Sequence, residues 1–134
     1  GYFASLDLPH PAPQPLALTA RDAAAAEALV RRGAPERGIP ACVSCHGEAM
    51  AGRLPSVPGL ITLPADYLIG QLGAWRTGQR RAVAPDCMAE VARRMTTEEI
   101  GSVARWLAAR PTPAGLRPEP AGPPLPIPCG SGER

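Results

Sequence analysis

The chain has 134 residues, 18 of which are proline, and a formal net charge of +2 at pH 7. This length allows one small domain with tails. The charge is nearly balanced and no basic stripe is interleaved with aromatic residues, which argues against nucleic acid as a partner. No apolar run reaches the length of a membrane-spanning helix, so we expect membrane association only through a partner or through a lost upstream segment.

Proline is concentrated near the two ends of the chain, with clusters at positions 9–15 and 111–128. Such segments cannot form helix interiors or central strands. We therefore expect a proline-rich N-terminal arm or linker at 1–18, a compact domain at 19–110, and a proline-rich C-terminal extension at 111–134.

The first predicted helix covers about Ala20 to Arg32. Thr19 is suited to cap its N-terminus, Asp22 lies in its first turn, and Gly33 can end it. No stretch alternates apolar and polar residues for long enough to predict a sheet. The sequence therefore predicts an all-α fold.

The run Cys42-Val43-Ser44-Cys45-His46 is the attachment signature of a c-type haem. The thiols of Cys42 and Cys45 add across the two haem vinyl groups, and His46 supplies one axial nitrogen to the iron. The sequence therefore predicts one covalently attached haem c. Bacterial haem attachment takes place outside the cytoplasmic membrane, so we expect a periplasmic protein, or one on the periplasm-facing side of the inner membrane.

Two other interpretations of the Cys-x-x-Cys pair are weaker. A structural zinc site needs four ligands, but Cys87 and Cys129 are far apart in the sequence and His10 lies in the proline-rich arm. A thioredoxin-like redox motif needs a preceding strand within a βαβ pattern. Here the motif follows Gly38-Ile39-Pro40-Ala41, and helical sequence surrounds it.

Two further helices are predicted downstream, at about Ala65 to Thr77 and at about Thr97 to Arg110. Thr96 and Glu99 have the spacing of a capping box at the start of the second. The segment 47–64, rich in glycine and proline, is expected to form an irregular loop after the haem motif.

An electron-transfer haem needs a second axial ligand, for which the candidates are Met50, Met88, Met95 and His10. Met50 follows His46 too closely to reach the opposite face of the haem. Met95 directly precedes the cap of the last predicted helix and is expected to pack inward. Met88 is expected on a loop, far enough along the chain to wrap around the haem, and is therefore favoured.

The chain resembles a class I cytochrome c and is similar to the domains of bacterial dihaem cytochromes c. The resemblance covers about residues 19–110 and implies a small fold of three main helices around one covalently bound haem. It implies that Met88 binds the iron, that the Pro58 carbonyl accepts a hydrogen bond from the proximal imidazole, and that the first and last helices cross near Trp106. Cys87, beside the ligand, departs from the usual pattern. The matching text is Gly38-Ile39-Pro40-Ala41-Cys42-x-x-Cys45-His46-Gly47, Pro58-x-Leu60, Tyr67-Leu68-x-x-Gln71-Leu72, Arg76-x-Gly78, Met88, Thr97-x-Glu99-Ile100 and Ala104-x-Trp106-Leu107.

The resemblance implies a one-electron carrier rather than an enzyme, with His46 and Met88 as iron ligands. The expected partners are redox proteins, namely a dehydrogenase, an oxidase or another cytochrome, and the chain could serve as a module of a larger respiratory or dehydrogenase complex. The alternative is a haem enzyme subunit or ligand sensor with an open or labile sixth site, which the neighbouring Cys87 would favour. A basic patch is the candidate docking surface, formed by Arg76, Arg80, Arg81, Arg93 and Arg94.

The two remaining cysteines, Cys87 and Cys129, are expected to form a disulfide, because exported proteins tend to pair their spare thiols. Such a bridge would fix the C-terminal extension near Met88. The segment Gly1–Leu6 is similar to Arg105–Arg110 at the end of the last predicted helix. This short repeat suggests a similar haem domain upstream, and the alternatives are a chance similarity or the remnant of a signal or anchor segment.

Overall fold

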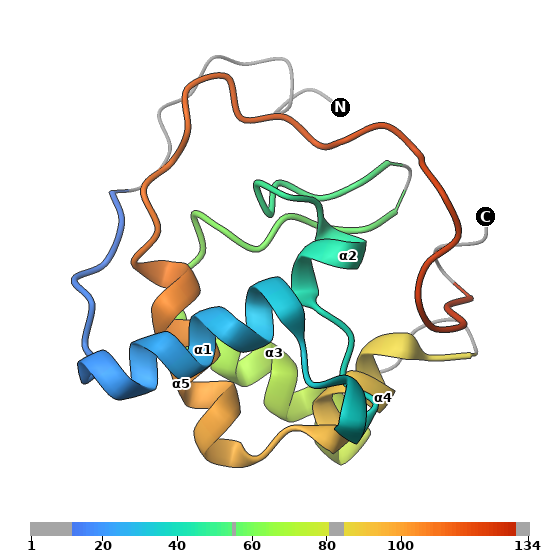
Figure 1. The fold of residues 1–134 in the computed structure, drawn as a ribbon, viewed down its shortest axis with the longest axis horizontal. Helices are drawn as coiled ribbons and strands as arrows, with labels where there is room; N and C mark the ends of the chain where they lie inside the picture. The colour runs from blue at the N-terminus through green and yellow to red at the C-terminus, as the bar shows by residue number, and fades with distance from the viewer. Residues whose placement is uncertain (1–11, 55, 81–84, 131–134) are drawn as a thin grey trace.

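The computed structural model describes residues 12–54, 56–80 and 85–130, and helices dominate this part of the chain (Figure 1). Among the described residues there are isolated β-bridges but no strand, so the predicted all-α class is confirmed. His10, Arg81 and Gly1–Leu6, on which predictions were made, lie outside the described residues. The helical elements are α1 (Ala20–Arg32), the 3-10 turn η2 (Pro35–Arg37), α2 (Cys42–His46), α3 (Ala65–Thr77), α4 (Cys87–Arg94) and α5 (Thr97–Ala108).

Helix α1 has the predicted bounds because local side chains specify both of its ends. The side chain of Thr19 accepts a hydrogen bond of 3.1 Å from the backbone N–H of Asp22, which satisfies one of the free donors at the helix start. Gly33 follows the helix at φ +69°, and a Cβ on it would lie 2.4 Å from the carbonyl oxygen of Ile39. Glycine is therefore required where the chain turns back closely on itself.

Helix α3 also has its predicted bounds, whereas α5 ends at Ala108 rather than at Arg110. The predicted capping box of α5 is present. Thr96 Oγ1 accepts from the Glu99 backbone N–H at 3.1 Å, and the Glu99 carboxylate accepts from the Thr96 N–H at 2.8 Å. The early end has a local cause, because Pro111 disfavours helical backbone at the residue before it.

Helices α1 and α5 pack against each other and form much of the core. Val30 on α1 and Val103 and Leu107 on α5 are almost fully buried. Trp106 is 2% exposed, and the Arg31 guanidinium of α1 lies 5.5 Å from the centre of its ring. The packing of the first and last helices near Trp106, which the resemblance implies, is therefore present.

Helix α4 was not predicted, and the expectation that Met88 lies on a loop was wrong, because Met88 is in the first turn of this helix. The Asp86 side chain caps the helix by accepting from the Ala89 N–H at 3.2 Å. An isolated helix of eight residues is only marginally stable in water. Burial of Ala89, Val91 and Ala92 stabilises it here.

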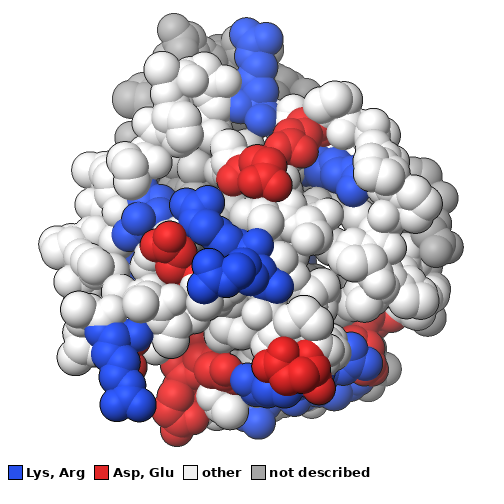
Figure 2. Space-filling model, viewed as in Figure 1, with Lys and Arg blue, Asp and Glu red and all other residues white. Residues whose placement is uncertain are grey.

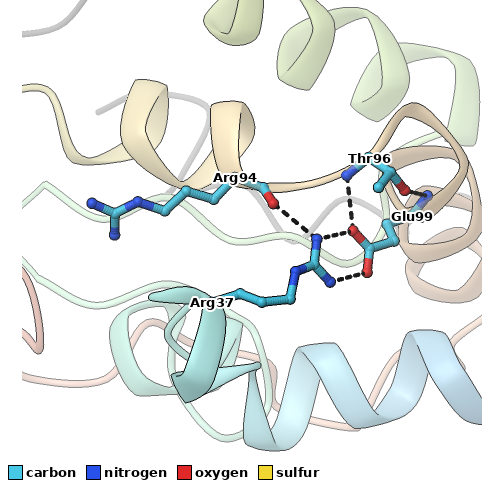
Figure 3. Close-up of polar contacts among 4 residues, drawn as sticks. All are labelled: Arg37, Arg94, Thr96 and Glu99. Atoms are coloured by element: carbon cyan, nitrogen blue, oxygen red, sulfur yellow. Dashed lines mark hydrogen bonds and ion pairs between the residues drawn. The ribbon is translucent and has the colours of Figure 1, made fainter.

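A side-chain network fixes the turn η2 to the junction between α4 and α5 (Figure 3). Arg37 donates two hydrogen bonds of 2.7 Å to the Glu99 carboxylate oxygens and one of 2.9 Å to the carbonyl oxygen of Arg94. Arg94 in turn donates to the carbonyl oxygen of Gly38 at 2.6 Å. The hydrogen-bonded Arg37 lowers the pKa of Glu99 to about 2. This network joins the segment that leads into α2 to the segment that carries Met88.

Both proline-rich ends lack helices within the residues that the structure describes. In Figure 1 the C-terminal segment leaves α5, runs across the top of the view and descends towards α4. The division of the chain into arms and a compact domain at residues 18/19 and 110/111 stays a prediction. No described helix is long and apolar enough to cross a membrane.

Candidate haem site

Helix α2 is only one turn long, and its spacing brings three functional side chains together. Residues three and four positions apart are neighbours on a helix, so Cys42, Cys45 and His46 share one face. All three line an apolar cavity of about 200 Å³. Both thiols are free. The cavity is therefore bordered by the complete attachment motif.

The imidazole of His46 is arranged as a metal ligand. The side chain is 6% exposed, and its Nδ1 lies 2.7 Å from the carbonyl oxygen of Pro58. Because a carbonyl can only accept, Nδ1 must carry the proton, and Nε2 keeps its lone pair. Burial lowers the pKa of His46, although the Pro58 hydrogen bond opposes that effect. The ring is therefore neutral, with a fixed tautomer and a free Nε2.

The two cysteines of the motif are both partly buried. Burial raises the pKa of Cys42 to about 11 and also raises the pKa of Cys45, an effect that nearby Arg53 partly offsets. The described residues include no cluster of three or more histidine, cysteine or acidic side chains that could hold a metal ion. The zinc interpretation thus gains no support.

The lining of the cavity fits a haem. Helices α3 and α5 contribute apolar side chains, including Leu68, Val103 and Leu107. One polar exception is Gln71, whose Oε1 is buried without a hydrogen-bond partner. The two thiols are the groups that attach a c-type haem, and an imidazole and a methionine sulfur are the groups that bind its iron. The apolar wall suits the haem ring.

Met88 and Met95 both line this cavity, and Met88 also lines an adjoining cavity of about 120 Å³ together with Cys45, His46 and Pro58. Met95 is 4% exposed and packs in the core, as does Met50. Of the three methionines, Met88 thus shares both cavities with the proximal histidine. Its assignment as iron ligand stays a prediction, with Met95 as the alternative to be tested.

The predicted disulfide between Cys87 and Cys129 is present, with an S–S distance of 2.05 Å. It brings the C-terminal extension to the site, where Leu125 and Ile127 line the smaller cavity. Sequence reasoning predicted the bridge but missed these two wall residues. The alternation of apolar side chains with prolines in this extension was the available signal.

Of the five arginines predicted as a docking patch, Arg81 lies outside the described residues, and several of the others are paired or stacked. Arg93 and Arg94 both pair with Glu90. Arg80 stacks 5.0 Å from the centre of the Trp75 ring. On the face drawn in Figure 2, acidic and basic side chains are interspersed. That face is therefore mixed in charge rather than strongly basic, and the docking patch stays a prediction.

The helical fold and the attachment motif define a class I cytochrome c domain. No family model matches the chain. It is 32% identical over 75 residues to cytochrome c-554(548) of Halomonas halodenitrificans, a match that covers 56% of this chain and 90% of that protein. The chain therefore belongs to the cytochrome c family, and covalently bound haem c is its implied cofactor.

Two longer proteins are also similar to the chain. A "thiosulfate dehydrogenase electron acceptor" from Thiomonas intermedia is 43% identical over 101 residues, which cover 75% of this chain and 45% of that protein. The structure of thiosulfate dehydrogenase (TsdBA) from Marichromatium purpuratum matches with a TM-score of 0.73 and 38% identity, covering 87% of this chain and 24% of the other. The chain thus spans less than half the length of either.

Proposed function

We propose that the chain is a one-electron carrier, or an electron-transfer module of a larger complex, that holds one haem c. Cys42 and Cys45 would attach the haem, and His46 and Met88 would bind its iron. The observation that carries the proposal is the geometry of α2, which sets two free thiols and a neutral imidazole with an unused Nε2 against a cavity also lined by Met88.

Bound haem supplies an iron that changes between the ferrous and ferric states. The protein's part is to keep the iron's surroundings constant between the two states. The Pro58 carbonyl fixes the orientation of His46 and raises its basicity. A thioether ligand such as Met88 favours the ferrous state and raises the reduction potential. The apolar lining excludes water, which disfavours the extra positive charge of the ferric state.

We further propose that the electron donor is a dehydrogenase that acts on thiosulfate, and that transfer occurs in the periplasm. The name of the Thiomonas relative and the likeness to TsdBA support this choice of partner. Covalent haem supports the compartment, because bacterial haem attachment takes place outside the cytoplasmic membrane.

Stopped-flow reduction tests the choice of donor. The oxidised haem protein is mixed with thiosulfate and a purified bacterial thiosulfate dehydrogenase, and the ferrous haem bands are followed. A mitochondrial cytochrome c at equal concentration is the control acceptor. We expect the chain to be reduced faster than the control. Equal or slower reduction would reject thiosulfate dehydrogenase as its specific donor.

The alternative of a haem enzyme or ligand sensor with a labile sixth site depended on Cys87. That thiol is part of the disulfide with Cys129, so it offers no thiolate to the iron or to a substrate. With the disulfide formed, Cys87 therefore no longer favours the alternative.

A further inference from the structure

Residues 119–130, here called the C-terminal strap, are attached to the loop that follows His46. The backbone of Glu119 donates to the Gly52 carbonyl at 2.9 Å, and its carbonyl accepts from the Leu54 N–H at 2.8 Å. The Glu119 side chain accepts from the Glu48 N–H at 2.8 Å. Arg53 adds a hydrogen bond to the carbonyl oxygen of Pro123. One end of the strap is therefore fixed on the proximal side of the site.

The other end of the strap is attached to the first turn of α4, next to Met88. Cys129 forms the disulfide with Cys87, and the Gly130 N–H donates to the Pro85 carbonyl at 2.9 Å. Cys129 is 7% exposed. This anchor therefore combines a covalent bond with burial and a backbone hydrogen bond, immediately before the proposed iron ligand.

Between the two anchors the strap forms part of the wall of the smaller cavity. Leu125 and Ile127 line it together with His46, Pro58 and Met88. Prolines occupy positions 120, 123, 124, 126 and 128, and proline-rich backbone is extended and stiff. A stiff segment fixed at both ends transmits the position of one anchor to the other. The strap thus links the loop after His46 to the helix that carries Met88.

We propose that the C-terminal strap holds Met88 on the iron and keeps small external ligands away from the sixth coordination position. The disulfide is the element that secures it. This inference rests on the proposed function, because it requires Met88 to be the ligand. Entry of an external ligand would replace the bond between the Met88 sulfur and the iron with a bond to that ligand, without any transfer of electrons. The strap governs how often that sulfur is free to leave.

Carbon monoxide binding to the ferrous holoprotein measures how often the Met88 sulfur leaves the iron. The test variant is the double substitution Cys87→Ser with Cys129→Ser, in which the haem stays attached through Cys42 and Cys45. The apparent affinity of a ligand scales with the population of the open state. We expect carbon monoxide to bind about tenfold more tightly than in the wild type, which corresponds to about 1.4 kcal/mol, with a faster observed rate.

Wild-type protein treated anaerobically with dithiothreitol provides the same test without a substitution. Two electrons and two protons from the dithiol convert the bridge into two thiols, and the dithiol becomes a cyclic disulfide. Alkylation and mass spectrometry verify that the bridge is open. We expect carbon monoxide binding to increase as in the double variant. Thr19→Ala is the control, because it removes the cap of the distant helix α1 and destabilises the fold without touching the strap; its carbon monoxide binding should equal that of the wild type.

The results separate the two proposals. If Met88→Ala binds carbon monoxide more tightly than the wild type but both bridge-opened forms do not, the strap proposal is overturned and the ligand assignment stands. If Met88→Ala behaves as the wild type and Met95→Ala binds more tightly, the ligand assignment falls and the strap proposal falls with it. Tighter binding in Met88→Ala and in both bridge-opened forms supports both.

Discussion

The substitution Glu99→Gln removes the charge from the network in Figure 3 but keeps an oxygen that can accept from Arg37 and from the Thr96 N–H. The pKa of Glu99 is about 2 in the folded protein against an ordinary value of 4.5, chiefly because of the hydrogen bond from Arg37. Without screening, this shift would correspond to about 3 kcal/mol. The Arg37 side chain is 39% exposed, however, and solvent screens such pairs strongly. We therefore expect the free energy of unfolding at pH 7 to fall by about 1 kcal/mol.

The effect should depend on pH with a definite sign. Because folding lowers the pKa of Glu99, its ionised form stabilises the fold fully above the ordinary value of 4.5, and this stabilisation is lost as the pH falls towards 2. The difference in unfolding free energy between the wild type and Glu99→Gln should therefore shrink between pH 4.5 and pH 2. Unfolding of the holoprotein by urea, which is uncharged and does not screen the ion pair, measures this difference when it is followed by far-ultraviolet circular dichroism at several pH values.

Glu98→Gln is the matched control. Glu98 lies in the same first turn of α5 and shares the interaction with the helix dipole, but the network in Figure 3 does not include it. A double-mutant cycle of Arg37→Gln with Glu99→Gln then isolates the pair itself. The reasoning would be refuted if Glu98→Gln and Glu99→Gln lowered the free energy of unfolding equally. A coupling energy near zero in the cycle would refute it as well.

Three further outcomes are expected. Replacing both Cys42 and Cys45 with alanine should allow acid–acetone to extract all the haem, whereas it should extract none from the wild type. In Met88→Ala the haem should remain attached but the reduction potential should fall by about 0.1 V or more, and the red ferric band typical of methionine ligation should disappear; Met50→Ala, as the control, should keep both properties. Gly33→Ala should lower the unfolding free energy by more than about 1 kcal/mol, because the new Cβ would contact the Ile39 carbonyl at positive φ. The matched Gly73→Ala should instead stabilise the protein by up to about 1 kcal/mol, since nothing lies within 4 Å of a Cβ added inside α3; thermal unfolding of the two variants decides, and equal shifts would contradict the argument.

The parts of the fold that the sequence predicted well are those whose ends are specified locally. Helix α1 has a side-chain cap at Thr19 and a glycine directly after its last turn, and both act over a few residues. The capping box of α5 is likewise local. Helix α4 also has a local side-chain cap, Asp86, but it is short and depends on burial of Ala89 and Ala92, as well as on the distant Cys129. Contacts between segments far apart in the sequence decide whether it forms.

In the candidate site, too, the parts that the local sequence determines were predicted, and the parts that depend on distant contacts were not. The local motif places Cys42, Cys45 and His46 on α2, and the hydrogen bond to Pro58 that the resemblance implies is present. The wall formed by the C-terminal strap was missed, because proline content predicts an extended chain but does not indicate which surface that chain covers. Cys129 was the one strong clue, since a spare cysteine in an exported protein predicts a covalent anchor.

Helix α4 is held at both ends by contacts that reach the proximal half of the site. At its N-terminus, the disulfide of Cys87 joins it to the strap and so to the loop after His46. At its C-terminus, Arg37 and Gly38 bind Arg94, just before α2 begins. A helix of eight residues behaves as a rigid body, so fixing its two ends also fixes the position of Met88. The geometry of the two proposed iron ligands thus depends on segments distant in sequence, which explains how a small core can present a well-defined site on a helix of only eight residues.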